Sequence, residues 1–238
     1  MTIADGAVAG RRPEEIESLV TLNRALLAQQ LLRGIAHDIR NNLQVVALGS
    51  SLGEDGAGTP VSIRVERSLD EMVRGLDLLS RLGRVATGEA ADADLTEILT
   101  AVDELAALQR NLPSLRVRIE RPADPTRVAI PKSELTQILL NLLANAKEAH
   151  NRPDDLVEVT TTMPMDGRIA ILIDDRGPGF PAAAGTPLYT TKDPCHHGGL
   201  GLFVSRELAT RRGGELGWEP RPGGGSRVRL VLPITARG

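Results

Sequence analysis

The sequence predicts an α+β protein in two parts, an N-terminal antiparallel helical hairpin followed by an α/β sandwich. Apolar residues recur every three or four positions over two long N-terminal stretches, as they do along one face of a helix. Beyond about residue 94 the pattern is mixed, with helical stretches between short alternating ones. The 238 residues, 41% of them hydrophobic, are enough for two such parts.

Composition excludes several classes of protein. Aromatic residues make up only 2% and the formal net charge is -3, so base stacking and a basic field for a polyanion are both unsupported. No apolar run is long enough to span a bilayer. Cys195 is the only cysteine, which fits a reducing compartment. We therefore expect a cytoplasmic protein with neither a nucleic-acid nor a membrane partner.

The first helix is expected from about Pro13 to Leu52, after a flexible tail over residues 1–13. A Gly-rich segment, 53–60, interrupts the helical pattern. One apolar stripe follows the helix, formed by Ile16, Leu19, Val20, Leu27, Leu31, Ile35, Ile39, Leu43 and Val46. We predict that this stripe is buried.

The second helix shows a heptad seam, formed by Val65, Leu69, Met72, Leu76 and Leu79. A single hairpin cannot cover both of its apolar stripes, so pairing with a second copy as a four-helix bundle is the simplest solution. We therefore predict a homodimerisation domain over residues 14–88. The alternative is a hairpin that packs on its own C-terminal domain.

A small, polar linker at 87–94 leads into the second domain, predicted over residues 89–238. Helices are expected at 95–110, 134–150 and near 200–211, and strands at 115–121, 157–162, 168–174 and 227–232. Helices and strands intermixed in this way predict one sheet covered by helices on one face.

His37 is the first residue with candidate chemistry. It lies about 200° around the first helix from Ile39, so it should face away from the buried stripe. A lone exposed histidine is usually only solvated. A neutral imidazole can attack phosphorus, however, and Asp38 beside it can hold the required tautomer. Asn41 lies one turn further, close enough to position water or a phosphoryl oxygen.

Four later segments carry further candidates. Asn141 and Asn145 are four residues apart, so their amides project from one helix face and offer oxygens to a hard cation. Asp175 leaves an apolar strand and can accept a hydrogen bond from an adenine amino group, with Gly177 and Gly179 beside it. The run 197–204 opens a helix whose N–H groups suit phosphate, and 223–226 resembles a hairpin turn. Each segment alone is equally explained by an ordinary structural role, such as a surface or capping side chain or a turn.

Residues 34–44 resemble the H-box of the bacterial two-component histidine kinases, in which His is followed by an acidic residue and then by Asn or Thr. The resemblance implies that His37 is the phosphoacceptor and Asp38 the general base. It also implies that Asn41 is needed to dephosphorylate a partner response regulator.

The four later segments resemble the N, G1, G2 and G3 boxes of the same family's ATP-binding domain, which shares its fold with DNA gyrase and MutL. Residues 187–192 resemble the F-box, with Leu188 and Tyr189 where two Phe are usual. Five boxes in the right order are far more specific than any one of them. By this resemblance Asn145 coordinates Mg²⁺ and Asn141 supports metal and phosphates.

The resemblance also assigns the rest of a site for ATP. Asp175 binds adenine, Gly177 and Gly179 shape its pocket, and Ser226 lies near an adenine-bound water. The implied phosphate contacts are Lys192, Gly199, Gly201 and Leu202, beneath a lid at about 180–198. Cys195, His196 and His197 are adjacent in sequence but make a poor zinc site without a fourth ligand.

Asn141 bears on the reaction. ATP-hydrolysing relatives have Glu at this position, and an amide cannot act as a base toward water, so His37 is the expected nucleophile. We therefore predict autophosphorylation on His37 and transfer to an Asp of a response regulator, with input either from an upstream sensor protein or through the N-terminal helix. The alternatives are a histidine phosphotransfer module with a degenerate nucleotide domain and a serine kinase of the anti-sigma type. The retained boxes argue against the first alternative, and the H-box argues against the second.

Overall fold

The computed structural model describes residues 12–51, 70, 73, 90–108, 116–122, 124–149, 156–165, 167–180, 199–221 and 223–235. Several predictions lie outside these residues: the tail, the loop 53–60, the heptad seam of the second helix, the F-box and the proposed lid. Lys192 and the Cys195–His197 segment lie outside them too. None of the described helices is long and apolar enough to cross a membrane.

The long first helix is present as predicted. α1 runs from Pro13 to Ser51, and Glu14 and Glu15 lie in its first turn, where negative charge favours the helix dipole. Ile16, Val20, Leu27 and Leu31 are buried along it, which agrees with the predicted stripe over this part of the helix.

The C-terminal part contains a five-stranded sheet in the order β2-β4-β5-β7-β6. Its strands are β2 (Arg116–Ile119), β4 (Leu156–Met165), β5 (Arg168–Asp174), β6 (Glu215–Pro220) and β7 (Ser226–Pro233). β2 and β4 are parallel, and the other neighbours are antiparallel. A small separate ladder joins β1 (Ala93–Asp94) to β3 (Arg127–Val128).

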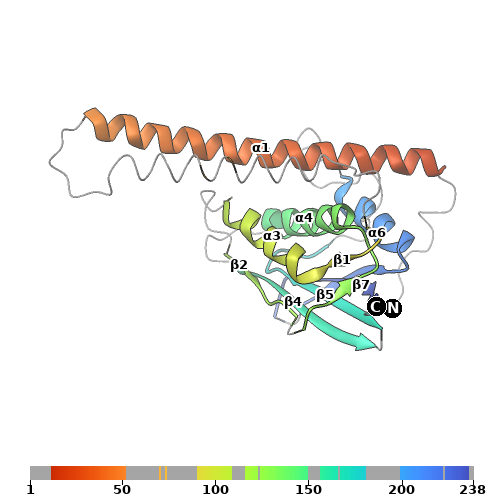
Figure 1. Cartoon of the computed structure of the whole chain (residues 1–238). Coiled ribbons are helices and arrows are strands. Elements are labelled where there is room, and N and C mark those ends of the chain that lie inside the picture. Colours follow the sequence, from red (N-terminus) through yellow and green to blue (C-terminus); the bar gives the residue numbers. More distant parts are fainter. Residues whose placement is uncertain are drawn as a thin grey trace.

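Three helices cover one face of this sheet: α3 (Leu95–Leu108), α4 (Lys132–Ala149) and α6 (Gly201–Arg211). Figure 1 shows α1 beyond these helices, on their far side from the sheet. Alternate residues of the central strands, such as Ile171 on β5 and Leu230 on β7, are fully buried beneath the helices. The sandwich predicted from the sequence is therefore confirmed.

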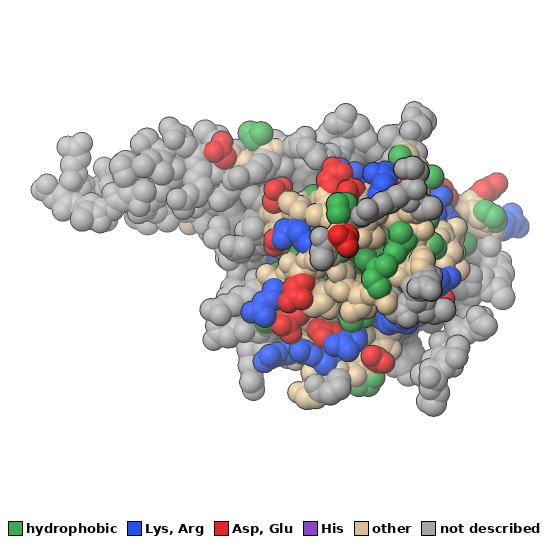
Figure 2. Space-filling view, turned by 60° about the horizontal axis from the view of Figure 1, so that its bottom comes forward, with side chains coloured by type: hydrophobic (Ala, Val, Ile, Leu, Met, Phe, Trp, Pro, Cys, Tyr) green, Lys and Arg blue, Asp and Glu red, His purple; other side chains and the backbone are tan. Residues whose placement is uncertain are grey.

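The opposite face of the sheet carries a chain of ion pairs. Arg227 makes two 2.7 Å hydrogen bonds to the carboxylate of Asp174, and Arg221 lies 3.5 Å from the same carboxylate. Arg221 also bonds Glu158, which pairs with Arg118. In Figure 2, which brings the bottom of Figure 1 forward, Lys and Arg side chains lie next to Asp and Glu side chains on this surface. The mixed charge keeps an open sheet face soluble.

The start of α1 belongs to the same core as the sandwich. Ile16 and Val20 pack in one buried cluster with residues of the C-terminal helices and sheet. α1 lies against both α4 and α6. Part of the hairpin region therefore does pack on its own C-terminal domain, as the alternative interpretation expected. The dimeric four-helix bundle and the boundaries between the domains stay predictions.

Candidate nucleotide-binding site

The predicted phosphoacceptor segment lies within α1, where His37, Asp38 and Asn41 all have helical backbone. Their side chains are outside the description, so the orientation of His37 stays a prediction. The helix continues well past this segment, to Ser51.

Asp175 lies at the end of β5, beside the start of β7. It is 2% exposed, and its backbone N–H donates to the Ser226 carbonyl at 2.9 Å. Its Oδ1 accepts hydrogen bonds from the backbone N–H groups of Gly177 (2.8 Å) and Ser226 (3.2 Å). Its Oδ2 accepts none from the residues that the structure describes. The carboxylate is therefore held by one oxygen while the other can accept a ligand N–H.

Two glycines allow this close packing. A Cβ on Gly177 would stand 2.5 Å from the Cβ of Ala149, so the turn after β5 is pressed against the end of α4. Gly225 has φ +96°, and a Cβ there would stand 2.0 Å from the Asp175 carbonyl oxygen. The two turns that flank Asp175 are thereby fixed relative to it.

The two asparagines of α4 differ in their surroundings. Asn141 is 3% exposed and lies close to Gly201, where a Cβ would stand 3.3 Å from the Asn141 Oδ1. Asn145 is half-buried, and its buried Nδ2 has no hydrogen-bond partner among the described residues. An unpaired buried amide is costly in a folded protein, so Asn145 fits a residue that awaits a ligand.

The start of α6 provides the predicted phosphate-binding features. Gly199 has φ +61° and precedes Leu200, the N-cap, which gives no side-chain cap to the helix. Gly201 and Leu202 form the first turn, whose N–H groups are therefore not satisfied by a capping side chain. Gly179, with φ +94°, ends the turn after Asp175.

A cationic stack lies beside this turn. The Arg206 guanidinium lies 4.6 Å from the centre of the Trp218 ring, and Phe180 contacts the same indole at a centroid distance of 5.6 Å. Burial lowers the pKa of the Arg206 guanidinium, although Glu207 opposes this effect. Phe180 directly follows Gly179, so the stack fixes the chain where it leaves the site.

The structure thus brings together the four segments singled out in the C-terminal half. Three polar residues around Asn141 were not predicted from the sequence: Asn23, Gln137 and Ser205. Asn23 lies between Val20 and Leu27 on the buried stripe of α1. A polar residue in an apolar stripe was the signal that could have found it.

Comparisons with known proteins agree with this geometry. The family of histidine kinase-, DNA gyrase B- and HSP90-like ATPases matches residues 131–236. The chain is 29% identical to sensor protein FixL of Bradyrhizobium diazoefficiens, over 93% of its own length and 47% of that protein. It is 30% identical to sensor protein CutS of Streptomyces coelicolor, over 92% of its own length and 56% of that protein. Residues 131–236 form an ATPase domain of the histidine kinase-, DNA gyrase B- and HSP90-like family.

Solved structures share the fold of this ATPase domain. The catalytic domain of ThkA matches with a TM-score of 0.53 at 24% identity, over 60% of this chain and 93% of that one. Full-length ShkA in complex with AMPPNP matches with a TM-score of 0.53 at 22% identity, over 95% of this chain and 47% of that one. The chain spans about half the length of FixL and CutS.

Proposed function

We propose that the chain acts as a protein histidine kinase that transfers the γ-phosphoryl group of ATP to His37. An imidazole nitrogen of His37 forms the N–P bond as the bond from phosphorus to the ADP oxygen breaks. Asp38 stabilises the imidazolium that develops. The phosphoryl group then passes to an Asp of a response regulator, and Asn41 serves the separate phosphatase reaction, in which water hydrolyses that aspartyl phosphate.

The environment of Asp175 is the single observation that carries the nucleotide part of this proposal. A carboxylate with one oxygen fixed by two backbone N–H groups and the other oriented for a donor suits the amino group of adenine. Guanine has a carbonyl oxygen at that position, which a carboxylate would repel. The geometry therefore favours ATP over GTP.

Mg²⁺ is the cation that we propose for this site. The amide oxygen of Asn145 would hold the ion. The Asn145 Nδ2, which has no hydrogen-bond partner among the described residues, would donate to a phosphate oxygen. Bound there, the ion would offset charge on the transferring phosphoryl group. Lys192 and the first turn of α6, with Gly199, Gly201 and Leu202, would contact the phosphates. Ser226 would hold the adenine water.

The partners follow from the same proposal. A response-regulator receiver domain accepts the phosphoryl group, and a second copy of the chain completes the helical bundle. An upstream sensor protein supplies the stimulus. A cytoplasmic location fits the single cysteine and the use of ATP.

The stability of the label tests this proposal against its alternatives. After incubation with Mg²⁺ and γ-labelled ATP, we expect a label that acid removes and alkali preserves, as for phosphohistidine. Nucleotide binding without label would favour an incomplete kinase, and absence of both with an intact fold would favour the phosphotransfer module. An acid-stable label would instead favour the serine kinase.

A further inference from the structure

Asn23 of α1 and Asn141 of α4 form a reciprocal amide pair although they are 118 residues apart in the sequence. The Asn23 Nδ2 donates to the Asn141 Oδ1 at 3.0 Å, and the Asn141 Nδ2 donates to the Asn23 Oδ1 at 2.9 Å. Both side chains are buried, at 4% and 3% exposure. Because the pair is excluded from water, its hydrogen bonds make the packing of α1 on α4 specific.

This pair uses most of the hydrogen-bonding capacity of Asn141. Its second N–H donates to the Ser205 hydroxyl at 3.2 Å, so both of its donors are occupied. Asn23 also accepts from Gln137 at 2.8 Å, and Gln137 donates to the Val20 carbonyl at 3.0 Å. Because both amide hydrogens are used, Asn141 could donate to a phosphate oxygen only after one of these bonds breaks.

Other contacts hold the same part of α1 on the catalytic domain. Arg24 donates to the Gln137 amide oxygen at 3.2 Å, and Arg211 of α6 pairs with Glu17 at 3.1 Å. Ile16 and Val20 lie in the shared apolar core. The segment of α1 that contacts the catalytic domain thus begins near the first turn of the helix. One face of this segment packs on the domain, and Asn23 on that face contacts Asn141 of the proposed nucleotide site.

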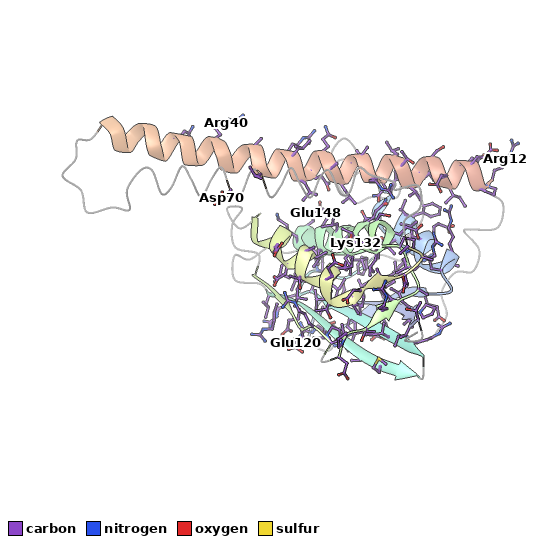
Figure 3. All side chains as sticks on the ribbon, in the orientation of Figure 1. Arg12, Arg40, Asp70, Glu120, Lys132 and Glu148 are labelled. Carbon is purple, nitrogen blue, oxygen red and sulfur yellow. The ribbon has the colours of Figure 1, made fainter. Side chains whose placement is uncertain are left out.

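The docked position keeps the nucleotide site away from His37. His37 lies 14 residues beyond Asn23 on α1, which corresponds to about 21 Å along the helix axis. In Figure 3, Arg40 lies beyond Glu148, near the end of α4. Asn145 lies four residues beyond Asn141 on α4, so measuring from Asn145 shortens the distance to His37 by at most about 6 Å. Transfer needs the reacting atoms about 3–3.5 Å apart, so this arrangement does not transfer phosphate to the His37 of the same chain.

We propose that Asn23 is an intramolecular latch, a positioning residue that holds Asn141 and keeps the catalytic domain docked away from His37. The inference rests on the proposed kinase function and deepens it. Release of Asn23 frees Asn141 for the nucleotide and frees the catalytic domain to move toward His37. Coupling between two binding equilibria is reciprocal. Any interaction that separates α1 from the catalytic domain therefore raises the affinity of the domain for ATP, and bound ATP weakens the docking of α1.

Asn23→Ala in the full chain tests the latch, because it removes the hydrogen bonds of Asn23 to Asn141 and Gln137, which the docked state alone contains. We expect the dissociation constant for an unhydrolysable ATP analogue with Mg²⁺ to fall about fivefold or more, and the rate of His37 labelling to rise by a similar factor. Arg24→Ala, which removes a weaker contact of the same segment, should change both quantities in the same direction but less.

Thr21→Ala is the matched control, since Thr21 is an exposed neighbour on the same turn and makes no contact with the amide pair. It should bind and label like the wild type. Unchanged or weaker binding in folded Asn23→Ala and Arg24→Ala, with a wild type that binds and labels, would overturn the latch and leave the kinase function intact. If no variant binds the analogue, the proposed function fails and the latch fails with it.

Discussion

At the scale of single residues, the site depends on the two oxygens of Asp175 having different tasks. Oδ1 is fixed by the Gly177 and Ser226 N–H groups, and Oδ2, which accepts no hydrogen bond from the described residues, would bind the proposed ligand. In Asp175→Asn the amide oxygen keeps the two backbone bonds, which turns an N–H toward the base. That N–H opposes the adenine amino group but suits the carbonyl of guanine.

Asp175→Asn should therefore weaken ATP binding by about tenfold or more, because a hydrogen bond to a charged group is lost. GTP binding should stay equal or improve. Competition titrations with both nucleotides measure the ratio of the two affinities. An equal loss for ATP and GTP would show that Asp175 only supports the fold.

Gly225 provides a second prediction at this scale. In Gly225→Ala the new Cβ would collide with the Asp175 carbonyl, and φ is positive there as well. In Gly224→Ala the backbone has φ +100° but the Cβ meets nothing, and in Gly217→Ala neither problem arises. We expect nucleotide affinity to fall more than tenfold only in Gly225→Ala, with a loss of about 1 kcal/mol of stability in Gly224→Ala.

Thermal unfolding and nucleotide titration of these three variants separate the two effects. Gly217→Ala should match the wild type in both measurements. Equal nucleotide affinity in Gly225→Ala and Gly224→Ala would mean that backbone conformation, and not the approach to Asp175, explains the need for glycine.

At the scale of elements, the ends of β5 and β7 are joined by the ion pair of Asp174 with Arg227. The hydrogen bond to Asp174 raises the pKa of the Arg227 guanidinium, so this guanidinium stays charged at any physiological pH. Asp174 is nearly buried, at 7% exposure. Removing Arg227 leaves this poorly solvated carboxylate with only the longer, 3.5 Å contact to Arg221.

Arg227→Gln should lower the free energy of unfolding by about 1–2 kcal/mol, as measured by urea denaturation. Arg229→Gln is the control, because Arg229 is exposed on the same face of β7 and has no ion-pair partner among the described residues. It should cost under about 0.5 kcal/mol. Equal losses in the two variants would contradict a specific role for the pair.

The elements also show what the sequence could and could not predict. The apolar run of β5 was predicted with its true bounds, Arg168–Asp174, because buried central strands are strongly patterned. β6 was missed, since an edge strand of six residues that contains Gly217 and Pro220 has little pattern to detect. The Asn23–Asn141 pair was missed because tertiary packing alone joins residues so far apart in the sequence.

At the scale of the whole molecule, one chain carries the nucleotide site and the proposed acceptor on parts that lie apart. The boxes around Asp175 meet at one site, whereas α1 docks through Asn23 with His37 further along the helix. Transfer within the chain would then require a movement of the catalytic domain along α1, by roughly 15–21 Å at 1.5 Å per residue. Regulation and chemistry would share this one movement.

The most direct test of the central claim is where the phosphoryl group ends. Arg33 and Arg40 flank His37, so trypsin releases residues 34–40 as one peptide with a single histidine. After incubation of the purified chain with Mg²⁺ and ATP, we predict that this peptide carries the phosphate. In His37→Ala the label should vanish while ATP affinity is kept. Label on any other peptide, or label that persists in His37→Ala, would contradict the account.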